Sequence, residues 1–154
     1  MPSRRDAIAM TEPELHRFLQ EERVVTVATI GPNGRPHLMP LWFVAEGSVI
    51  SAWTFAKSQK VKNLERDPRA TLQIEAGDQY QELRGAMLEC DVEIIRDVAK
   101  VTKTGTAIMS RYAGIPVGDE VPDSVRAQAP KRVVLVFRAT RVSSWDHRKL
   151  GGAY

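Results

Sequence analysis

The sequence predicts a mostly β protein, an antiparallel and closed or partly open barrel of six strands with short helices. Apolar, β-branched runs recur along the chain, and clusters of turn-forming residues separate them. The connections between these runs are short enough for antiparallel neighbours. With 154 residues, of which 43% are hydrophobic and 27% charged, the chain has the composition of one globular domain. We therefore expect a single domain over residues 1–154, with residues 1–9 and 153–154 flexible.

The six predicted strands cover residues 24–30, 35–44, 49–54, 70–75, 81–95 and 132–143. Pro36 and Pro40 interrupt the second strand, and proline has no N–H to donate to a ladder. This strand should therefore lie at an edge or bend out of the sheet near Pro40. Alternation in the fifth strand directs Cys90 to the core, as a small apolar residue without a reactive role. Gly85 in the same strand predicts a bulge or a close backbone approach.

Predicted helices cover about residues 12–22, 59–66 and 98–112, with a short helix starting at 123 or 124. Thr11 and Glu14 form a capping box for the first helix. Ser58 is placed to cap the second helix, which Asp67-Pro68 ends. Acidic residues cluster at 119–123, but no histidine or further carboxylate stands at ligand spacing. We expect no metal site there.

The segment 57–69 differs in character from the strands around it. It contains Lys57, Ser58, Lys60, Lys62, Asn63, Arg66 and Arg69. A capped helix start offers free N–H groups and a partial positive charge to an anion. Lys60 in the first turn opposes the helix dipole but suits an anion, which suggests a binding site. A solvated basic face is the alternative interpretation.

The order and spacing of several short motifs are more specific than any one of them. The motifs are Gly34-Arg35-Pro36, Pro40-Leu41-Trp42, Thr54, Ser58, Lys60, Asn63-Leu64 and Asp67-Pro68. In this order they resemble the flavin and deazaflavin oxidoreductases of the FMN-binding split-β-barrel, pyridoxamine-phosphate-oxidase-like superfamily. With the segment SWDHRKLGG at 144–152, the chain resembles the actinobacterial branch that uses the deazaflavin coenzyme F-420. The resemblance runs from about residue 10 to 152.

This resemblance implies a six-stranded split barrel that forms a homodimer, with two cofactor sites at the interface. It implies a phosphate site at Ser58, Lys60 and Asn63, with Lys57 nearby. The backbone of Pro40, Leu41 and Trp42 would border the cofactor ring. Trp53 and Thr54 could line the same slot, and barrel core is the alternative for Trp53.

The C-terminal segment contributes the remaining candidates. Trp145, His147 and Lys149 lie close together in the sequence, with two further charged residues between them. An aromatic ring, an imidazole and a cation suit stacking on a ring and meeting an anionic cofactor tail. The resemblance supports this role, with the residues supplied by the partner subunit as one arrangement.

The sequence lacks the motifs of nucleophilic, metal-dependent and dinucleotide chemistry, such as G-x-S-x-G, H-E-x-x-H and G-x-G-x-x-G. This fits an enzyme whose cofactor carries the chemistry. The resemblance implies an F-420-dependent reductase that transfers a hydride between the cofactor and a small conjugated or unsaturated substrate. The FMN oxidases of the superfamily carry R-x-V-L-L-K on the second strand, where this chain has PHLMPLWF. That difference argues against pyridoxamine phosphate as substrate and, less strongly, against FMN.

Two other classes of function remain open. One is an FMN-binding oxidoreductase or cofactor carrier, and the other is a barrel that binds single-stranded nucleic acid through aromatics and cations. A net charge of +3 does not require nucleic acid as a partner. A single cysteine excludes an internal disulfide, and no signal peptide or apolar stretch of membrane-spanning length is visible. We expect a cytoplasmic protein that binds no nucleic acid and does not span a membrane.

Overall fold

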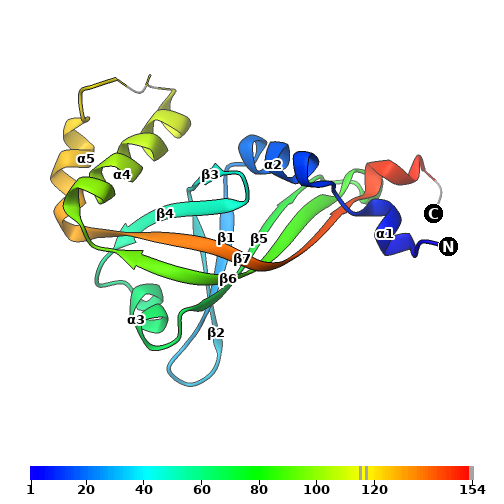
Figure 1. Ribbon diagram of the computed structural model, residues 1–154, viewed down its shortest axis with the longest axis horizontal. Coiled ribbons are helices and arrows are strands. Elements are labelled where there is room, and N and C mark those ends of the chain that lie inside the picture. The colour runs from blue at the N-terminus through cyan, green and yellow to red at the C-terminus, as the bar shows by residue number, and fades with distance from the viewer. Residues whose placement is uncertain (115, 117, 153–154) are drawn as a thin grey trace.

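The computed structural model describes residues 1–114, 116 and 118–152, so the expected flexibility of 153–154 lies outside the described residues. Within this part of the chain, seven strands form one antiparallel sheet in the order β2-β1-β5-β6-β7-β4-β3. The sheet twists and curls into a half-barrel (Figure 1). The mostly β, split-barrel fold class is therefore confirmed, but the expected count of six strands is wrong.

The strands are β1 (Val25–Ile30), β2 (Pro36–Leu41), β3 (Val44–Glu46), β4 (Val49–Phe55), β5 (Arg69–Ala76), β6 (Arg84–Ile95) and β7 (Arg132–Asp146). The α-helices are α1 (Arg4–Ile8), α2 (Glu12–Glu21), α3 (Gln59–Arg66), α4 (Val98–Ala113) and α5 (Asp123–Gln128). Short 3-10 helices are η1 (Tyr80–Glu82), η2 (Ala129–Lys131) and η3 (His147–Leu150). The Thr11–Glu14 capping box of α2 is present as predicted. Helix α1 was not predicted from the sequence.

The additional strand arises because the expected second strand, residues 35–44, breaks around Phe43. Pro40 cannot donate to a ladder. The Phe43 N–H donates to the Tyr112 hydroxyl (3.0 Å), and the Phe43 C=O accepts from Arg111 (2.6 Å). Both backbone groups of Phe43 are therefore bonded to side chains of α4. The chain crosses here from β2 at one edge of the sheet to β3 at the other, so the predicted edge position and bend are confirmed.

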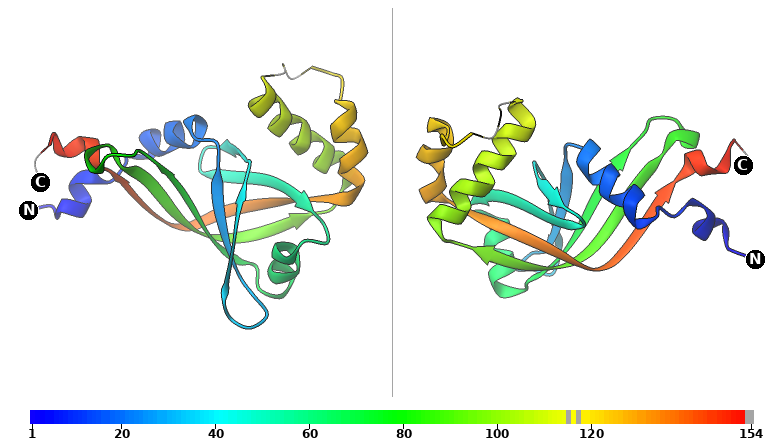
Figure 2. Two further views of the ribbon diagram at one scale, coloured as in Figure 1. Left: turned by 180° about the vertical axis from the view of Figure 1, so that it is seen from behind. Right: turned by 45° about the horizontal axis from the view of Figure 1, so that its top comes forward.

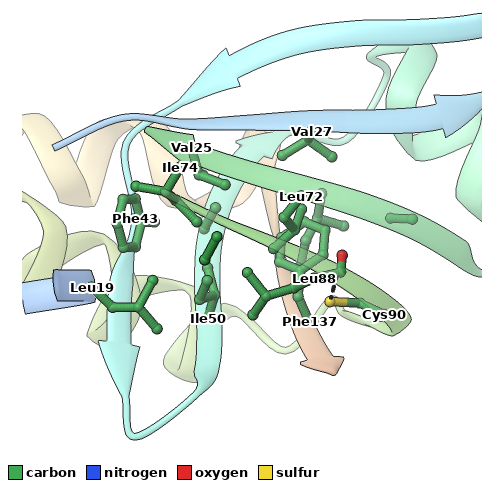
Figure 3. Packing of buried hydrophobic residues seen from close by; sticks show 14 of the residues in the cluster. Leu19, Val25, Val27, Phe43, Ile50, Leu72, Ile74, Leu88, Cys90 and Phe137 are labelled. Atoms are coloured by element: carbon green, nitrogen blue, oxygen red, sulfur yellow. Dashed lines mark hydrogen bonds between the residues drawn. The ribbon is translucent and has the colours of Figure 1, made fainter. Parts of the chain in front are cut away.

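Alternate residues of the strands fill the interior of the half-barrel (Figure 3). Val25 and Val27 of β1 are fully buried, while Thr26 between them is partly exposed. Leu72 of β5 lies opposite Leu88 of β6, and both are in the same core. Cys90 is buried beside them, and burial raises the pKa of its thiol to about 12. The prediction that Cys90 is a core residue is confirmed.

The last strand is longer than predicted, since β7 ends at Asp146 rather than at 143. Trp145 lies opposite Gly85 of β6. A Cβ atom on Gly85 would lie 2.4 Å from the Trp145 ring and 2.8 Å from the Ile74 carbonyl oxygen. The predicted close approach at Gly85 is therefore confirmed, and Trp145 belongs to the sheet rather than to a tail.

The helices lie at different ends of the sheet (Figures 1 and 2). Helices α4 and α5 are at the end where β4 and β7 pair, and α4 contacts both strands. Helix α3 lies below β1 and β6, whereas α1 contacts η3 at the opposite end of the molecule. None of the described helices has the length and apolar content needed to cross a bilayer.

Candidate functional site

Helix α3 begins directly after Ser58, as predicted, but the Ser58 side chain does not cap it. The Ser58 Oγ is buried and has no hydrogen-bond partner among the described residues. An α-helix also leaves its first N–H groups without internal partners. No acidic residue occupies the first turn of α3. The start of α3 therefore combines unpaired donors with the positive end of a helix dipole.

Lys60, in the same turn, is a buried cation with only 6% of its surface exposed. Its ammonium donates to the Thr54 hydroxyl (2.8 Å), and no carboxylate of the described residues pairs with it. Burial lowers the pKa of Lys60, and the nearby charge of Arg132 lowers it further. A buried cation without a counter-charge is unfavourable, so a bound anion would stabilise this arrangement.

The other cations of segment 57–69 differ from Lys60 in their exposure. Exposed side chains in this segment include Lys57, Lys62, Arg66 and Arg69. A solvated basic face therefore describes these four residues and does not describe Lys60. Of the five cations in this segment, Lys60 is therefore buried and the other four are at the surface.

Asn63 is fully buried and joins α3 to β1. Its Nδ2 donates to the Thr29 hydroxyl (3.0 Å), and its Oδ1 accepts from Gln59 (2.8 Å). Thr29 lies opposite His37 on β2, whose Nδ1 is buried without a partner among the described residues. His37 was not among the predicted site residues, and its signal in the sequence was one histidine within the apolar run PHLMPLWF.

The motif Pro40-Leu41-Trp42 lies where β2 ends. Pro40 and Trp42 are exposed, and Leu41 packs against the core. Trp53 is on β4, near the opposite edge of the sheet from β2. Tyr112 of α4 stacks on the Trp42 ring, and Gly105 of the same helix lies against the Trp53 ring. Gly105 and Tyr112 are about two turns, or about 10 Å, apart along the helix. Helix α4 therefore contacts predicted residues both from β4 and from the end of β2.

Trp53 itself is covered by α4. A Cβ atom on Gly105 would lie 2.5 Å from the Trp53 ring. The Arg132 guanidinium lies over Trp53 (4.5 Å to the ring centroid) and over Phe55 (4.2 Å). Trp53 also packs against a second apolar cluster that includes Val134. This placement favours the packing role for Trp53.

Trp145 is near the end of β7, and His147 and Lys149 are in η3 directly after it. This end of β7 lies away from α3 (Figure 1). Thr54, the hydrogen-bond partner of Lys60, is opposite Val133 at the start of β7, and Trp145 is near its end. At 3.3 Å per residue, the distance along the strand is on the order of 40 Å. One chain therefore does not bring the C-terminal candidates to the start of α3.

The C-terminal candidates also have partners of their own. His147 Nδ1 lies 2.8 Å from the Tyr80 carbonyl oxygen. The Lys149 ammonium donates to Glu14 (2.6 Å) and to the Ala9 carbonyl oxygen (2.7 Å). These contacts connect η3 to η1 and to the segment around α2.

A cleft of about 580 Å³ opens over β1, β5, β6 and β7. Thr29 lines it, together with the exposed guanidinium groups of Arg69 and Arg141. None of the twelve predicted site residues belongs to its described lining. Among the residues that the structure describes, no group of three or more histidine, cysteine or acidic side chains is placed to hold a metal ion.

Comparison with solved structures finds this architecture in several proteins. The conserved hypothetical protein Rv2991 of Mycobacterium tuberculosis is 40% identical, with a TM-score of 0.91 over 99% of this chain and 95% of that chain. An F420 reductase is 26% identical, with a TM-score of 0.67 over 83% of this chain and 94% of that chain. A FAD-binding protein of Mesorhizobium loti shares the fold at 15% identity, with a TM-score of 0.66 over 88% of this chain and 93% of that chain.

Comparison of the sequence with curated proteins gives no significant match. The family model described as pyridoxamine 5'-phosphate oxidase, in contrast, matches residues 11–146. This range includes all seven strands and the start of α3. The chain therefore belongs to the pyridoxamine 5'-phosphate oxidase family.

Proposed function

We propose that this protein is an oxidoreductase that binds the deazaflavin coenzyme F-420, with a phosphate of the cofactor at Lys60. The observation that carries this proposal is the burial of Lys60 without a counter-charge at the start of α3. The likeness to an F420 reductase, at 26% identity over 83% of this chain, supports the choice of cofactor. The bound cofactor supplies the hydride chemistry for a small conjugated or unsaturated substrate.

The side chains at α3 fit an anionic group. Ser58 Oγ is buried without a partner in the described part of the chain, so it can donate one directional bond. An ammonium has three N–H groups, and Lys60 directs one of them to Thr54. The first-turn N–H groups of α3 add further donors. Hydrogen bonds from a charged donor to phosphate are stronger than neutral ones, so Lys60 should contribute most.

The remaining candidates divide into two roles. Thr54 orients the Lys60 ammonium, and Asn63 fixes α3 against β1. Pro40 and Trp42 are exposed where β2 ends, and there they can border the cofactor ring. The surface Lys57 adds a second, screened charge near the phosphate.

We also propose a homodimer with the cofactor sites at its interface. The edge strand β2 exposes Leu38 (61%) and Met39 (40%). Apolar side chains on an unpaired edge favour covering by another surface. The segment from Trp145 to Lys149 can join the α3 site only from the second copy, because its own chain holds it at the far end of β7.

FMN is the alternative cofactor, and a cofactor carrier is the alternative role. The residues 37–43 contain no lysine or arginine, whereas the FMN oxidases that the chain resembles carry a basic pair on this strand. This difference favours F-420 over FMN. It also argues against pyridoxamine phosphate as the substrate.

Titration of the purified protein with F-420 and with FMN, followed by calorimetry and cofactor fluorescence, tests the proposal. We expect tighter binding of F-420. A clear preference for FMN, or copurification with yellow FMN, would support the alternative. If neither cofactor bound, both versions of the proposal would be wrong.

A further inference from the structure

Trp42 presents a flat aromatic surface that is covered on one side. The ring of Tyr112, from α4, stacks on it with centroids 4.5 Å apart and planes within 8°. Despite this contact, 53% of Trp42 remains exposed. The Arg23 guanidinium also lies over the Tyr112 ring, 5.4 Å from its centroid. The indole and phenol rings therefore form a stack in which the indole is about half exposed.

The last turn of α4 fixes this stack in place. The Tyr112 hydroxyl donates to the Arg23 carbonyl oxygen (2.6 Å) and accepts from the Phe43 N–H (3.0 Å). Arg111 donates to the Phe43 carbonyl oxygen (2.6 Å) and lies over the Phe43 ring. Arg111 also donates to three carbonyl oxygens at the end of α2, those of Leu19, Gln20 and Glu22. The bend that contains Trp42 is therefore fixed through Phe43, which α4 binds, and α4 is in turn bound to the end of α2.

We propose that Trp42, positioned by Tyr112, stacks on a planar conjugated ring of the ligand used in the reaction. This inference rests on the proposed function, and the ring belongs to the cofactor or to the acceptor. The electron-rich face of an indole suits an electron-poor ring such as an oxidised deazaflavin, a flavin or a quinone. Because its orientation is already fixed, Trp42 loses little conformational freedom on binding.

The position of Trp42 supports this assignment. Tyr112, which stacks on Trp42, and Gly105, which lies against Trp53, are about 10 Å apart along α4. Thr54, next to Trp53 on β4, orients Lys60. A ligand whose anionic group contacts Lys60 can therefore direct its ring towards Trp42. Tyr112 does not touch the ligand in this arrangement and acts as a positioning residue.

Three variants test the stack with F-420, FMN and menadione as probes. Trp42→Leu should leave the melting temperature nearly unchanged, because the side chain is half exposed, and should weaken ring binding roughly 10-fold. Tyr112→Leu should lower both stability and affinity. Tyr112→Phe keeps the ring and loses the hydroxyl bonds, so it should melt earlier than wild type and still bind normally. A purely structural role for Tyr112 would instead make affinity follow stability in both variants and overturn the positioning role.

The probes identify the source of the ring. If Trp42→Leu binds F-420 and FMN more weakly than wild type does, the ring belongs to the cofactor. If the cofactor-loaded Trp42→Leu protein instead binds only menadione more weakly, the ring belongs to the acceptor. If Trp42→Leu binds all three probes as tightly as wild type does, the inference is overturned. This holds also if size-exclusion chromatography shows that the substitution weakens the dimer. If the wild type binds no probe, the proposed function fails and this inference fails with it.

Discussion

The Lys60 ammonium lies 2.8 Å from the Thr54 hydroxyl, and this contact joins the first turn of α3 to the end of β4. A hydroxyl orients a cation but does not neutralise it. The pair therefore holds a buried positive charge in a defined place while leaving it without a counter-ion in the described part of the chain. An anionic ligand would supply the counter-ion at the position that the Thr54 contact defines.

Lys60→Met should stabilise the ligand-free protein by about 1 kcal/mol, because it replaces a buried, unpaired cation with an apolar side chain of similar length. The effect should depend on pH. Since burial lowers the pKa of Lys60 below 10.5, the folded protein loses this proton at a lower pH than the unfolded chain. Wild-type stability is therefore recovered as pH rises from the lowered pKa towards 10.5.

Urea unfolding of both proteins at about pH 7 and pH 10 measures this difference. The advantage of Lys60→Met should be largest at the lower pH and smaller at the higher one. Comparing variant with wild type cancels the contributions of the other groups that titrate in this range. An advantage of equal size at both pH values would contradict the burial of a charged Lys60.

Gly105→Ala should lower the free energy of unfolding by about 1–3 kcal/mol, the range for overpacking a tight interior contact. The added Cβ would lie 2.5 Å from the Trp53 ring. Alanine favours helix formation over glycine by about 1 kcal/mol, so a net loss reports the clash. Lys103→Ala, on the exposed side of the same helix, is the matched control. A Gly105→Ala protein as stable as wild type would show that α4 does not cover Trp53.

Arg111→Lys should lower the free energy of unfolding by about 2 kcal/mol, although it keeps the charge. A lysine cannot donate simultaneously to the carbonyl oxygens of Phe43 and of the end of α2 as the guanidinium does. Arg126→Lys, at an exposed position on α5, should have little effect. Thermal unfolding of both variants gives the comparison, and equal melting temperatures would rule out the bracing role of Arg111.

Gly85→Ala should also lower the free energy of unfolding by about 1–3 kcal/mol. The methyl group would collide with the Trp145 ring and with the Ile74 carbonyl oxygen. Gln73→Ala, at an exposed position on β5, is the control. Chemical denaturation measures both variants. An unchanged midpoint for Gly85→Ala would mean that Trp145 is not packed on β6.

Much of the fold follows from local patterns in the sequence. Turn residues and β-branched runs indicated the barrel, and the Thr11 capping box and the proline after α3 marked helix ends. The strand count failed at Phe43, because the groups that break the strand belong to Arg111 and Tyr112, far along the chain. The sequence predicted the helix α4 but could not show which backbone groups its last turn would bind.

The candidate site was predicted in part. The sequence selected Lys60, but a cluster of cations does not reveal which one is buried. The C-terminal candidates were grouped with the α3 residues by resemblance, and the register of β7 places Trp145 at the far end of the strand. His37 was missed, because its burial depends on the pairing of β2 with β1.

Titration of Lys60→Ala and Lys62→Ala with F-420 tests the buried cation most directly. The two lysines are on the same helix, but Lys60 is 6% exposed and Lys62 is at the surface. Lys60→Ala should weaken binding by about 1.5–3 kcal/mol, the range for hydrogen bonds to charged groups, while Lys62→Ala should bind nearly as wild type does. Equal losses in the two variants, or wild-type affinity in Lys60→Ala, would show that α3 offers a diffuse basic face and not an anion site.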